Sequence, residues 1–340
     1  MTAIPETMRA LAQLHDGFGS DPTGQRLERL EPYVALQEVP VPEPGPGQAL
    51  VRVARAAVNP SDVAFIKGLY GQPRRKGVAA GFEGTGTVVA GETDLIGRRV
   101  AFFGSGTGTW AEYALTDAAT LIPLRDDVRD EDAAGLIVNP VTAAAMFDLV
   151  RAAGAPAFVA TAATSQLGKF LCALGRDAGI PCLAHVRRSA AAETLRAHGA
   201  AEVLATDADG YGERMRAAME THGPTVLLDA VAGPASAELF FAMPDGARWV
   251  CYGRLSAEPP VLGDMAQFIF RGKRIEGFWL TRWMQEAGRE RVAATVGEVQ
   301  ARFASGAWAT DISEVVPLGA AMARLPEAYG AKDAKVLIAP

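Results

Sequence analysis

The spacing of apolar and polar residues divides the chain into two regions of different character. Before Glu131, short alternating apolar runs are separated by turns that contain glycine and proline, a pattern typical of β structure. The expected strands of this region are Met8–Leu14, Tyr33–Val39, Gln48–Ala57, Thr85–Ala90 and Arg99–Phe103. We therefore expect an all-β first region whose loops converge on one place.

From Ala157 onward, apolar strands alternate with helices. The expected strands are Ala157–Thr161, Pro181–Val186, Glu202–Ala205, Thr225–Val231, Ala247–Tyr252 and Arg274–Gly277. Helices are expected between most of these strands, for example at Ala190–His198 and Tyr211–His222. This alternation predicts an α/β fold with a doubly wound parallel sheet.

Three further segments connect and close the chain. A helical link at Glu131–Val150, broken at Val138-Asn139-Pro140, joins the two regions. A helix at Arg289–Ser305 and strands at Glu314–Pro317 and Lys335–Ile338 follow the second region. We expect this tail to return to the first domain.

The stretch Ala157–Asp177 has the strand–turn–helix pattern of a nucleotide-binding turn. In such a turn, backbone N–H groups and the positive end of the helix receive a pyrophosphate. Of the three glycines in the standard fingerprint only Gly168 is in place, because Thr164, Ser165 and Gln166 fill the turn. Ser165 is expected to cap the helix. The stretch alone leaves a nucleotide site and a nucleotide-free scaffold both open.

The end of the next strand indicates which dinucleotide would bind. Nucleotide-binding sheets carry either an acidic residue here, for the ribose 2′-hydroxyl, or an arginine, for a 2′-phosphate. Arg187 and Arg188 stand at this point, without a carboxylate. A planar guanidinium meets phosphate oxygens two at a time, so we predict NADP(H). The alternative interpretation is a solvated surface pair.

Composition narrows the classes of protein. The chain has 340 residues, 49% of them hydrophobic and 21% charged, which is ordinary for a globular protein of two domains. Its net charge of −6 argues against nucleic acid as a partner. We expect a cytoplasmic protein without membrane contact, because the sequence has no leader-like pattern and no membrane-length apolar run. Cys172, Cys182 and Cys251 stand isolated in apolar runs and are interpreted as small core residues.

Five phrases of the sequence carry a family resemblance. They are Val58–Asp62 (VNPSD), Gly68–Gly71 (GLYG), Gly108–Trp110 (GTW), Val138–Pro140 (VNP) and Gly277–Trp283 (GFWLTRW). In order and spacing, the chain resembles the medium-chain dehydrogenase/reductase superfamily over essentially its full length. The resemblance implies a GroES-like, β-rich catalytic domain at 1–138 and 284–340, and a Rossmann dinucleotide-binding domain at 139–283.

The resemblance is to the zinc-free branch of that superfamily. Its zinc alcohol dehydrogenases carry a cysteine at the position of Asn59, a histidine at that of Phe82 and a third ligand near Val138. None of these residues is a zinc ligand, and the four-cysteine structural zinc loop is absent, so no metal is expected. The zinc-free branch reduces activated carbon–carbon double bonds and quinones.

Within that branch the phrases resemble those of the 2-enoyl thioester reductases, including the mitochondrial type. Quinone reductases share the Asn-Pro-Ser-Asp phrase but usually lack the Tyr-Gly and Phe-Trp-Leu phrases. The resemblance implies that Tyr70 is the proton-donating tyrosine, that the substrate is a small molecule and that a homodimer forms. The implied cofactor contacts are Asn139, Thr164, Ser165, Gln166, Leu167, Arg187, Arg188, Tyr252, Gly253, Phe278, Trp279, Leu280, Thr281 and Lys335. Gln166 departs from a family glycine, and Ser189 stands where the family can have a second basic residue.

The chemistry fits this reading. Reduction of an α,β-unsaturated thioester needs a hydride at Cβ, which the nicotinamide supplies, and a proton at Cα. A phenol such as Tyr70 carries its proton at neutral pH and can stabilise the developing enolate oxygen or protonate carbon. We therefore predict an NADPH-dependent enoyl-thioester reductase. An NADPH:quinone or enone oxidoreductase is one alternative. The other, favoured by Gln166, is a non-catalytic protein that binds nucleotide, or nothing, as a sensor or structural protein.

Several residues allow both a structural and a functional interpretation. Trp279 and Trp283 either wall an acyl pocket or pack as core residues, and Trp110 is interpreted as core. We interpret Glu83 as forming a structural hydrogen bond in its turn and Asp62 as a helix-start contact.

Three further features are open in the same way. Tyr70 itself is either catalytic or a loop aromatic that covers a strand end. His185 stands at a strand end near the expected ribose, but we interpret it as a buried histidine. The basic run Arg74–Lys76 either attracts the phosphates of a coenzyme A or carrier-protein thioester or is a solvated loop. A homodimer is expected through sheet edges near Ala247–Leu255.

Overall fold

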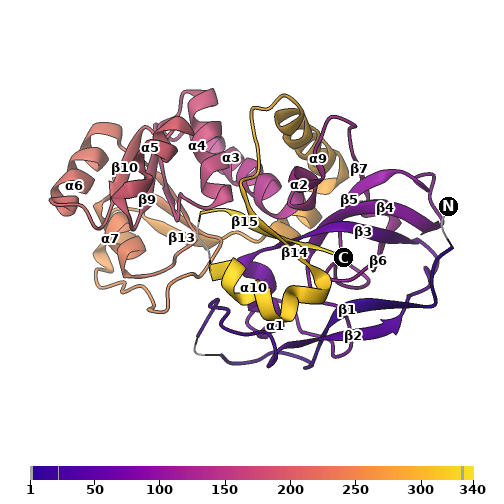
Figure 1. The fold of residues 1–340 in the computed structure, drawn as a ribbon. Coiled ribbons are helices and arrows are strands. Elements are labelled where there is room, and N and C mark those ends of the chain that lie inside the picture. Colours follow the sequence, from indigo (N-terminus) through magenta and orange to yellow (C-terminus); the bar gives the residue numbers. More distant parts are fainter. Residues whose placement is uncertain (1–2, 22, 331–332) are drawn as a thin grey trace. The chain divides into compact units, whose positions relative to one another are not determined.

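The computed structural model describes residues 3–21, 23–330 and 333–340 (Figure 1). It has two compact units: unit 1 comprises Met1–Val138 and Gly297–Pro340, and unit 2 comprises Asn139–Val296. The division expected from the sequence lies at 138/139 and 283/284. The second structural boundary lies inside helix α9 (Leu280–Ala304), which is kinked where Gly288 adopts φ 76° and ψ 162°.

Unit 1 is built on a seven-stranded sheet of order β14-β15-β3-β4-β5-β7, in which β6 also pairs with β3. Its strands are β3 (Gln48–Val58), β4 (Glu83–Gly91), β5 (Arg99–Phe103), β6 (Tyr113–Asp117), β7 (Ile122–Pro123), β14 (Ile312–Pro317) and β15 (Lys335–Ala339). Strand β15 pairs antiparallel with β3, so the tail does return to the first region. Strands β1 (Thr7–Gln13) and β2 (Val34–Pro40) form a separate antiparallel pair.

The helices of unit 1 are short: α1 (Pro60–Ile66), α2 (Asp130–Ala134) and α10 (Ala321–Gly330). At the start of α1, the carboxylate of Asp62 accepts the backbone N–H of Asn59 at 2.7 Å, which confirms the helix-start interpretation. The segment Ile137–Val141 is a π turn that contains Pro140, so the helical link is broken where the sequence predicts.

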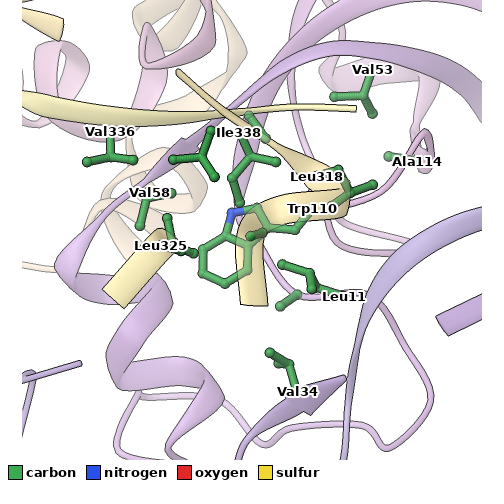
Figure 2. Close-up of a cluster of buried hydrophobic side chains, with 14 of the residues drawn as sticks. Leu11, Val34, Val53, Val58, Trp110, Ala114, Leu318, Leu325, Val336 and Ile338 are labelled. Carbon is green, nitrogen blue, oxygen red and sulfur yellow. The ribbon is translucent and has the colours of Figure 1, made fainter. Parts of the chain in front are cut away.

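Trp110 lies at the centre of the unit 1 core. Its side chain is fully buried, and its indole N–H donates to the carbonyl of Ala57 at 3.1 Å. Figure 2 shows the ring among apolar side chains from distant parts of the sequence, including Leu11, Val58 and Leu325. The interpretation of Trp110 as a core residue is confirmed.

Unit 2 contains a six-stranded parallel sheet of order β10-β9-β8-β11-β12-β13. Its strands are β8 (Phe158–Thr161), β9 (Cys182–Val186), β10 (Glu202–Ala205), β11 (Val226–Asp229), β12 (Arg248–Cys251) and β13 (Arg274–Gly277). This is the 3-2-1-4-5-6 order of dinucleotide-binding sheets, in which the order reverses between the first and fourth strands, here β8 and β11. The predicted doubly wound parallel sheet is confirmed.

Helices connect these strands in the way the pattern predicts. The connecting helices are α4 (Gln166–Ala178), α5 (Ala192–Ala197), α6 (Tyr211–His222), α7 (Pro234–Ala242) and α8 (Ala266–Ile269), and α3 (Thr142–Ala152) precedes β8. Among the described residues, no helix combines the length and apolarity that crossing a membrane requires.

The expected sheet edge needs correction, and the cysteines can be placed. The segment near Ala247–Leu255 is not a sheet edge, because β12 is hydrogen-bonded on both sides and the edge strands are β10 and β13. The interpretation as small core residues is confirmed for Cys172 and Cys182, which are fully buried, whereas Cys251 is half-buried. All three are free thiols, but the sulfurs of Cys172 and Cys182 lie 3.6 Å apart because α4 packs onto β9.

Candidate functional site

The turn after β8 is built as the nucleotide-binding pattern requires. Ser165 is the N-cap of α4, and its hydroxyl accepts the backbone N–H of Gly168 at 3.1 Å, as predicted. A Cβ on Gly168 would lie 2.5 Å from the Cα and carbonyl oxygen of Ala163, so this glycine permits the close helix–strand approach. Ala162 adopts the left-handed region, with φ 48°, where such turns commonly hold glycine.

The other residues predicted in this turn lie at the start of α4. Thr164 and Ser165 are partly exposed, whereas Gln166 and Leu167 are buried in the first turn of the helix. Gln166 is the first residue of α4, so it belongs to the helix and not to the turn, where the sequence places it. The missing glycine is therefore compatible with a short strand-to-helix connection.

Asp229, at the end of β11, organises the neighbouring strand ends and was not among the predicted site residues. Its buried carboxylate accepts the hydroxyl of Thr161 at 2.5 Å and the indole N–H of Trp249 at 2.8 Å. It also accepts the backbone N–H groups of Val231 and Ala232 and the hydroxyl of Ser236, each at 2.9 Å. The carboxylate therefore ties β8, β11 and β12 together at the point where the strand order reverses.

The sequence does contain a signal for this residue. Asp229 is the acidic member of the apolar run Thr225–Val231, and an acidic side chain inside a buried strand needs several donors. The observed strand ends at Asp229, two residues before the expected end, because its carboxylate draws the next N–H groups into a turn.

The arginine pair lies where the fold predicts. Arg187 and Arg188 are exposed and follow β9 directly, beside β8 in the sheet. The next residue, Ser189, donates its backbone N–H to Asp207 at 2.8 Å. His185 in β9 is buried against Tyr211, whose hydroxyl lies 3.1 Å from its Nε2, and burial lowers the pKa of this histidine to about 4. The interpretation of His185 as a buried histidine is confirmed.

The segment after β12 contains a glycine packed closely on the Ala230 backbone and a buried tyrosine hydroxyl, that of Tyr252. A Cβ on Gly253 would lie 2.7 Å from the carbonyl oxygen of Ala230, so glycine is needed here for packing alone. The hydroxyl of Tyr252 is buried, and within the described part of the chain it has no hydrogen-bond partner. Burial raises the pKa of this phenol, so it remains protonated and needs an acceptor.

The last predicted cofactor segment of unit 2 follows β13. The backbone N–H of Phe278 donates to the carbonyl of Cys251 at 2.8 Å, which extends the strand pairing. Phe278 and Trp279 are half-buried, Leu280 is buried at the start of α9, and Thr281 is exposed. Asn139, in the π turn, is half-buried at the first position of unit 2.

In unit 1, Tyr70 is part of an aromatic cluster. Its ring centroid lies 4.9 Å from that of Phe82 and 6.4 Å from that of Phe65. The Phe65 and Phe82 rings are themselves 4.9 Å apart. Tyr70 as a whole is partly exposed, although its ring packs against these two phenylalanines.

A buried polar network is centred on Glu83, the residue after Phe82 of this cluster. The amide of Asn59 donates to Glu83 at 2.8 Å and accepts from the ammonium of Lys335. The second oxygen of Glu83 accepts the backbone N–H groups of Ile137 and Val138 at 3.0 and 2.8 Å. The structural interpretation of Glu83 is confirmed, although its bonds reach well beyond its own turn.

This network brings together Asn59, Phe82 and Val138, the three positions that the family resemblance compares with zinc ligands. Asn59 and Val138 both bond to Glu83, and the backbone N–H of Phe82 donates to Asp62 at 2.7 Å. The described residues contain no group of three or more histidine, cysteine, aspartate or glutamate side chains that could hold a metal ion.

Burial dominates the titration of this network. It raises the pKa of Asp62 to about 7, with repulsion from Glu83 adding to the effect and hydrogen bonds from Asn59 and Phe82 opposing it. Burial also raises the pKa of Glu83 and lowers that of Lys335, and the attraction between the two opposes both shifts. The ammonium of Lys335 is engaged inside unit 1, and its contact with a cofactor stays a prediction.

The basic run Arg74–Lys76 contains one buried residue and two exposed residues. Arg74 is buried, and its guanidinium donates to backbone carbonyls, so it is neither a solvated residue nor one that can attract a phosphate. Arg75 and Lys76 are exposed, and Arg75 donates to the carbonyl of Gly106 at 2.8 Å. The expectation of a uniform basic cluster is wrong for Arg74, because the loops around it need a buried donor.

The chain is similar to known proteins over most of its length. The alcohol dehydrogenase GroES-like domain family matches residues 45–126, inside unit 1. The mitochondrial enoyl-[acyl-carrier-protein] reductase of Bos taurus is 28% identical over 294 residues, which is 84% of this chain and 76% of that protein. Its Caenorhabditis elegans counterpart is 30% identical over 250 residues, 71% of each chain.

One solved structure matches over the full length. It is the crystal structure of a Mesorhizobium loti protein provisionally named an NADPH:quinone reductase. That protein is 46% identical, the alignment covers 100% of both chains, and the TM-score is 0.95.

Proposed function

The chain belongs to the zinc-free branch of the medium-chain dehydrogenase/reductase superfamily, an NADP-dependent group of oxidoreductases, and from this we propose that it reduces the C=C bond of 2-enoyl thioesters. Unit 1 has the GroES-like, β-rich fold of this family and unit 2 its Rossmann fold. Relatives named as mitochondrial enoyl-[acyl-carrier-protein] reductases support the thioester as substrate.

The observation that carries the proposal is the contact between Tyr70 and Phe82. Phe82 stands where zinc members of the superfamily have a metal ligand, and the Tyr70 ring packs on it at 4.9 Å. A phenol at this place takes over the task that a metal has elsewhere, polarising the substrate oxygen. The partly exposed Tyr70 has the hydroxyl for it.

The residues of unit 2 fit NADP(H). The buried hydroxyl of Tyr252 lacks an acceptor among the described residues, and a dinucleotide at the strand ends offers many. The N-terminus of α4, capped by Ser165, suits the pyrophosphate, and Arg187 and Arg188 suit a 2′-phosphate. When bound, the nicotinamide supplies the hydride for Cβ.

The chain's own residues then handle the proton and the developing charge. In this mechanism the Tyr70 hydroxyl donates a hydrogen bond to the thioester oxygen as the enolate forms, or a proton to Cα. The apolar rings of Phe65 and Phe82 hold the phenol by packing and compete with none of its hydrogen bonds.

The test compares crotonyl-CoA with a small quinone, each with NADPH. We expect crotonyl-CoA to be the better substrate by kcat/KM, and Tyr70→Phe to lower kcat for it about 10²-fold while NADPH affinity stays within about twofold. Tyr113→Phe, a change of another partly exposed tyrosine in unit 1, is the matched control and should behave as wild type. A thioester rate no better than background would remove the proposal.

Quinone reduction is the second candidate, because the 46%-identical Mesorhizobium loti protein carries that provisional name. A quinone needs no proton at carbon, so its reduction should depend weakly on Tyr70. Quinone turnover that exceeds thioester turnover and survives Tyr70→Phe would favour this candidate. NADPH titration followed by tryptophan fluorescence addresses a non-catalytic protein that binds no nucleotide, for which no saturable change with NADPH is expected.

A further inference from the structure

The loop that carries Tyr70 is fixed at its far end by Arg74. We call residues 67–74 the tyrosine loop and residues 16–19 the bracing loop. Arg74 is only 8% exposed, and its guanidinium joins the end of α1, where the tyrosine loop begins, to the bracing loop. It donates to Ile66 on one side at 3.2 Å and to Gly17 and Phe18 on the other at 3.0 and 3.2 Å, always to backbone carbonyls.

The two loops also touch directly through glycine. The backbone N–H of Gly19 donates to the carbonyl of Gly68 at 2.9 Å, and Arg74 and Gly17 exchange both backbone hydrogen bonds at 3.1 Å. A Cβ on Gly68, which has φ 75°, would lie 2.4 Å from the Gly19 nitrogen and 2.8 Å from the Arg74 guanidinium carbon. The guanidinium therefore fills a space that the two glycines leave beside the crossing.

The near end of the tyrosine loop is fixed by a second buried cation, Lys67. Its ammonium donates to the hydroxyl of Thr23 at 2.7 Å and to the carbonyl of Arg26, and it lies 3.5 Å from the carboxylate of Asp21. Tyr70 thus lies between two anchors, each of which reaches into the segment before β2.

From this geometry we propose that Arg74 is the positioning residue for the Tyr70 phenol; the inference rests on the proposed role of Tyr70 as proton donor. Arg74 lies four residues from Tyr70 and acts through the backbone of the loop. Loss of its forked donors leaves several buried carbonyls unpaired and lets the crossing at Gly68 relax. A displacement of about 1 Å at a catalytic group can cost about 10²-fold in rate.

The experiment is a double-mutant cycle of Arg74→Gln and Tyr70→Phe with crotonyl-CoA and NADPH. We expect Arg74→Gln to lower kcat at least about tenfold in the wild-type background, with the KM for NADPH within about twofold. In the Tyr70→Phe background the same change should lower kcat less than about twofold, because no phenol remains to be positioned.

Three companion variants keep the test decisive. Arg98→Gln changes an exposed arginine of unit 1 and should leave kcat unchanged, while Val88→Ala lowers stability in the core of that unit without touching either loop. Arg74→Lys keeps the charge with fewer donors and serves if Arg74→Gln does not fold. It should show a smaller loss of kcat with the same dependence on Tyr70.

Each outcome has one meaning. An equal loss from Arg74→Gln in both backgrounds, or a loss matched by Val88→Ala, would overturn the positioning role while leaving the proposed function intact. A Tyr70→Phe enzyme with wild-type kcat would instead overturn the proton-donor assignment, and the positioning role with it.

Discussion

At the scale of single residues, two alanines in unit 2 adopt backbone angles that L residues usually avoid. Ala162 has φ 48° and Ala232 has φ 51°. They lie just after β8 and β11, the two strands between which the order reverses. Strained backbone of this kind is frequent at ligand sites, and here it lies at the carboxyl ends of the two central strands, where we propose that the cofactor binds.

Replacing one of these alanines by glycine tests the strain. We expect Ala162→Gly to raise the free energy of unfolding by about 0.5–1 kcal/mol in urea titrations, because glycine reaches positive φ without a steric penalty. Ala163→Gly is the matched control: Ala163 is not among the positive-φ residues, so glycine there should destabilise by a similar amount. Equal destabilisation by both changes would contradict the assignment of strain to Ala162.

Asp62 makes the stability of the protein depend on pH. Its pKa of about 7 lies above the ordinary value of 3.8, so the folded state favours the protonated carboxyl. This contribution to stability is fully present below pH 3.8 and is lost as the pH rises through about 7. The free energy of unfolding that is lost in this way between about pH 5 and pH 8 is about 3 kcal/mol.

Comparison with a variant that cannot ionise isolates this effect. The free energy of unfolding of wild type, minus that of Asp62→Asn, should fall between about pH 5 and pH 8. Glu83, Lys335 and Tyr329 face the same carboxyl and are present in both proteins, so their own titration largely cancels. Asp94→Asn, an exposed change, should give a flat difference. A flat difference for Asp62→Asn as well would mean that the carboxyl is already ionised at pH 5.

Some residue roles can be predicted from the local sequence, and others become visible only in the structure. The cap at Ser165, the close approach at Gly168 and the buried Trp110 follow from local pattern, because each role needs a particular side chain at a particular element end. The carboxylate of Asp229 and the guanidinium of Arg74 act on segments distant in sequence. Charge and position alone therefore suggest surface residues where the structure has buried ones.

At the scale of elements, helix α4 depends on its contact with the turn before it. We expect Gly168→Ala to lower the free energy of unfolding by about 2 kcal/mol. The new Cβ would lie 2.5 Å from the backbone of Ala163, and backbone atoms cannot shift without disturbing the turn. NADPH affinity should fall with it, since α4 would shift at the proposed pyrophosphate site.

The matched control is another helical glycine with open space. Gly297→Ala in α9 meets nothing within 4 Å and should raise stability by up to about 1 kcal/mol through helix propensity. If Gly168→Ala were stabilising as well, the two glycines would be equivalent and the packing argument for α4 would fail.

Element types were predictable because buried parallel strands are continuous apolar runs and the helices between them are not. Strand β10 and helix α6 have the predicted bounds, whereas β11 and β12 end earlier than expected. The Asp229 carboxylate ends β11, an effect that apolar periodicity does not encode. Apolar periodicity does not encode the kink in α9 either, because the kink lies at the non-helical backbone angles of Gly288.

At the scale of the whole molecule, the sheet of unit 2 has two edge strands among the described residues, β10 and β13, and the second lies beside an apolar segment. Strand β13 pairs with β12 on one side only. The chain around this edge exposes large apolar side chains: Val261 is 69% exposed, Met265 59%, Ile269 69%, Phe270 82% and Ile275 39%. An open edge strand beside such a patch invites pairing with another chain.

We expect the partner to be a second copy of this chain, because a strand edge is self-complementary across a two-fold axis. Wild type should sediment as a dimer at micromolar concentration, and the double change Ile269→Glu with Phe270→Glu should weaken the dimer at least about tenfold, since each glutamate replaces an exposed apolar anchor. Phe18→Glu removes a side chain that is 65% exposed in unit 1 and should leave the dimer intact. A monomeric wild type would leave this edge without its expected partner. A double variant that dimerises as tightly as wild type would place the interface elsewhere, because two buried charges at a strand edge cannot be accommodated without loss.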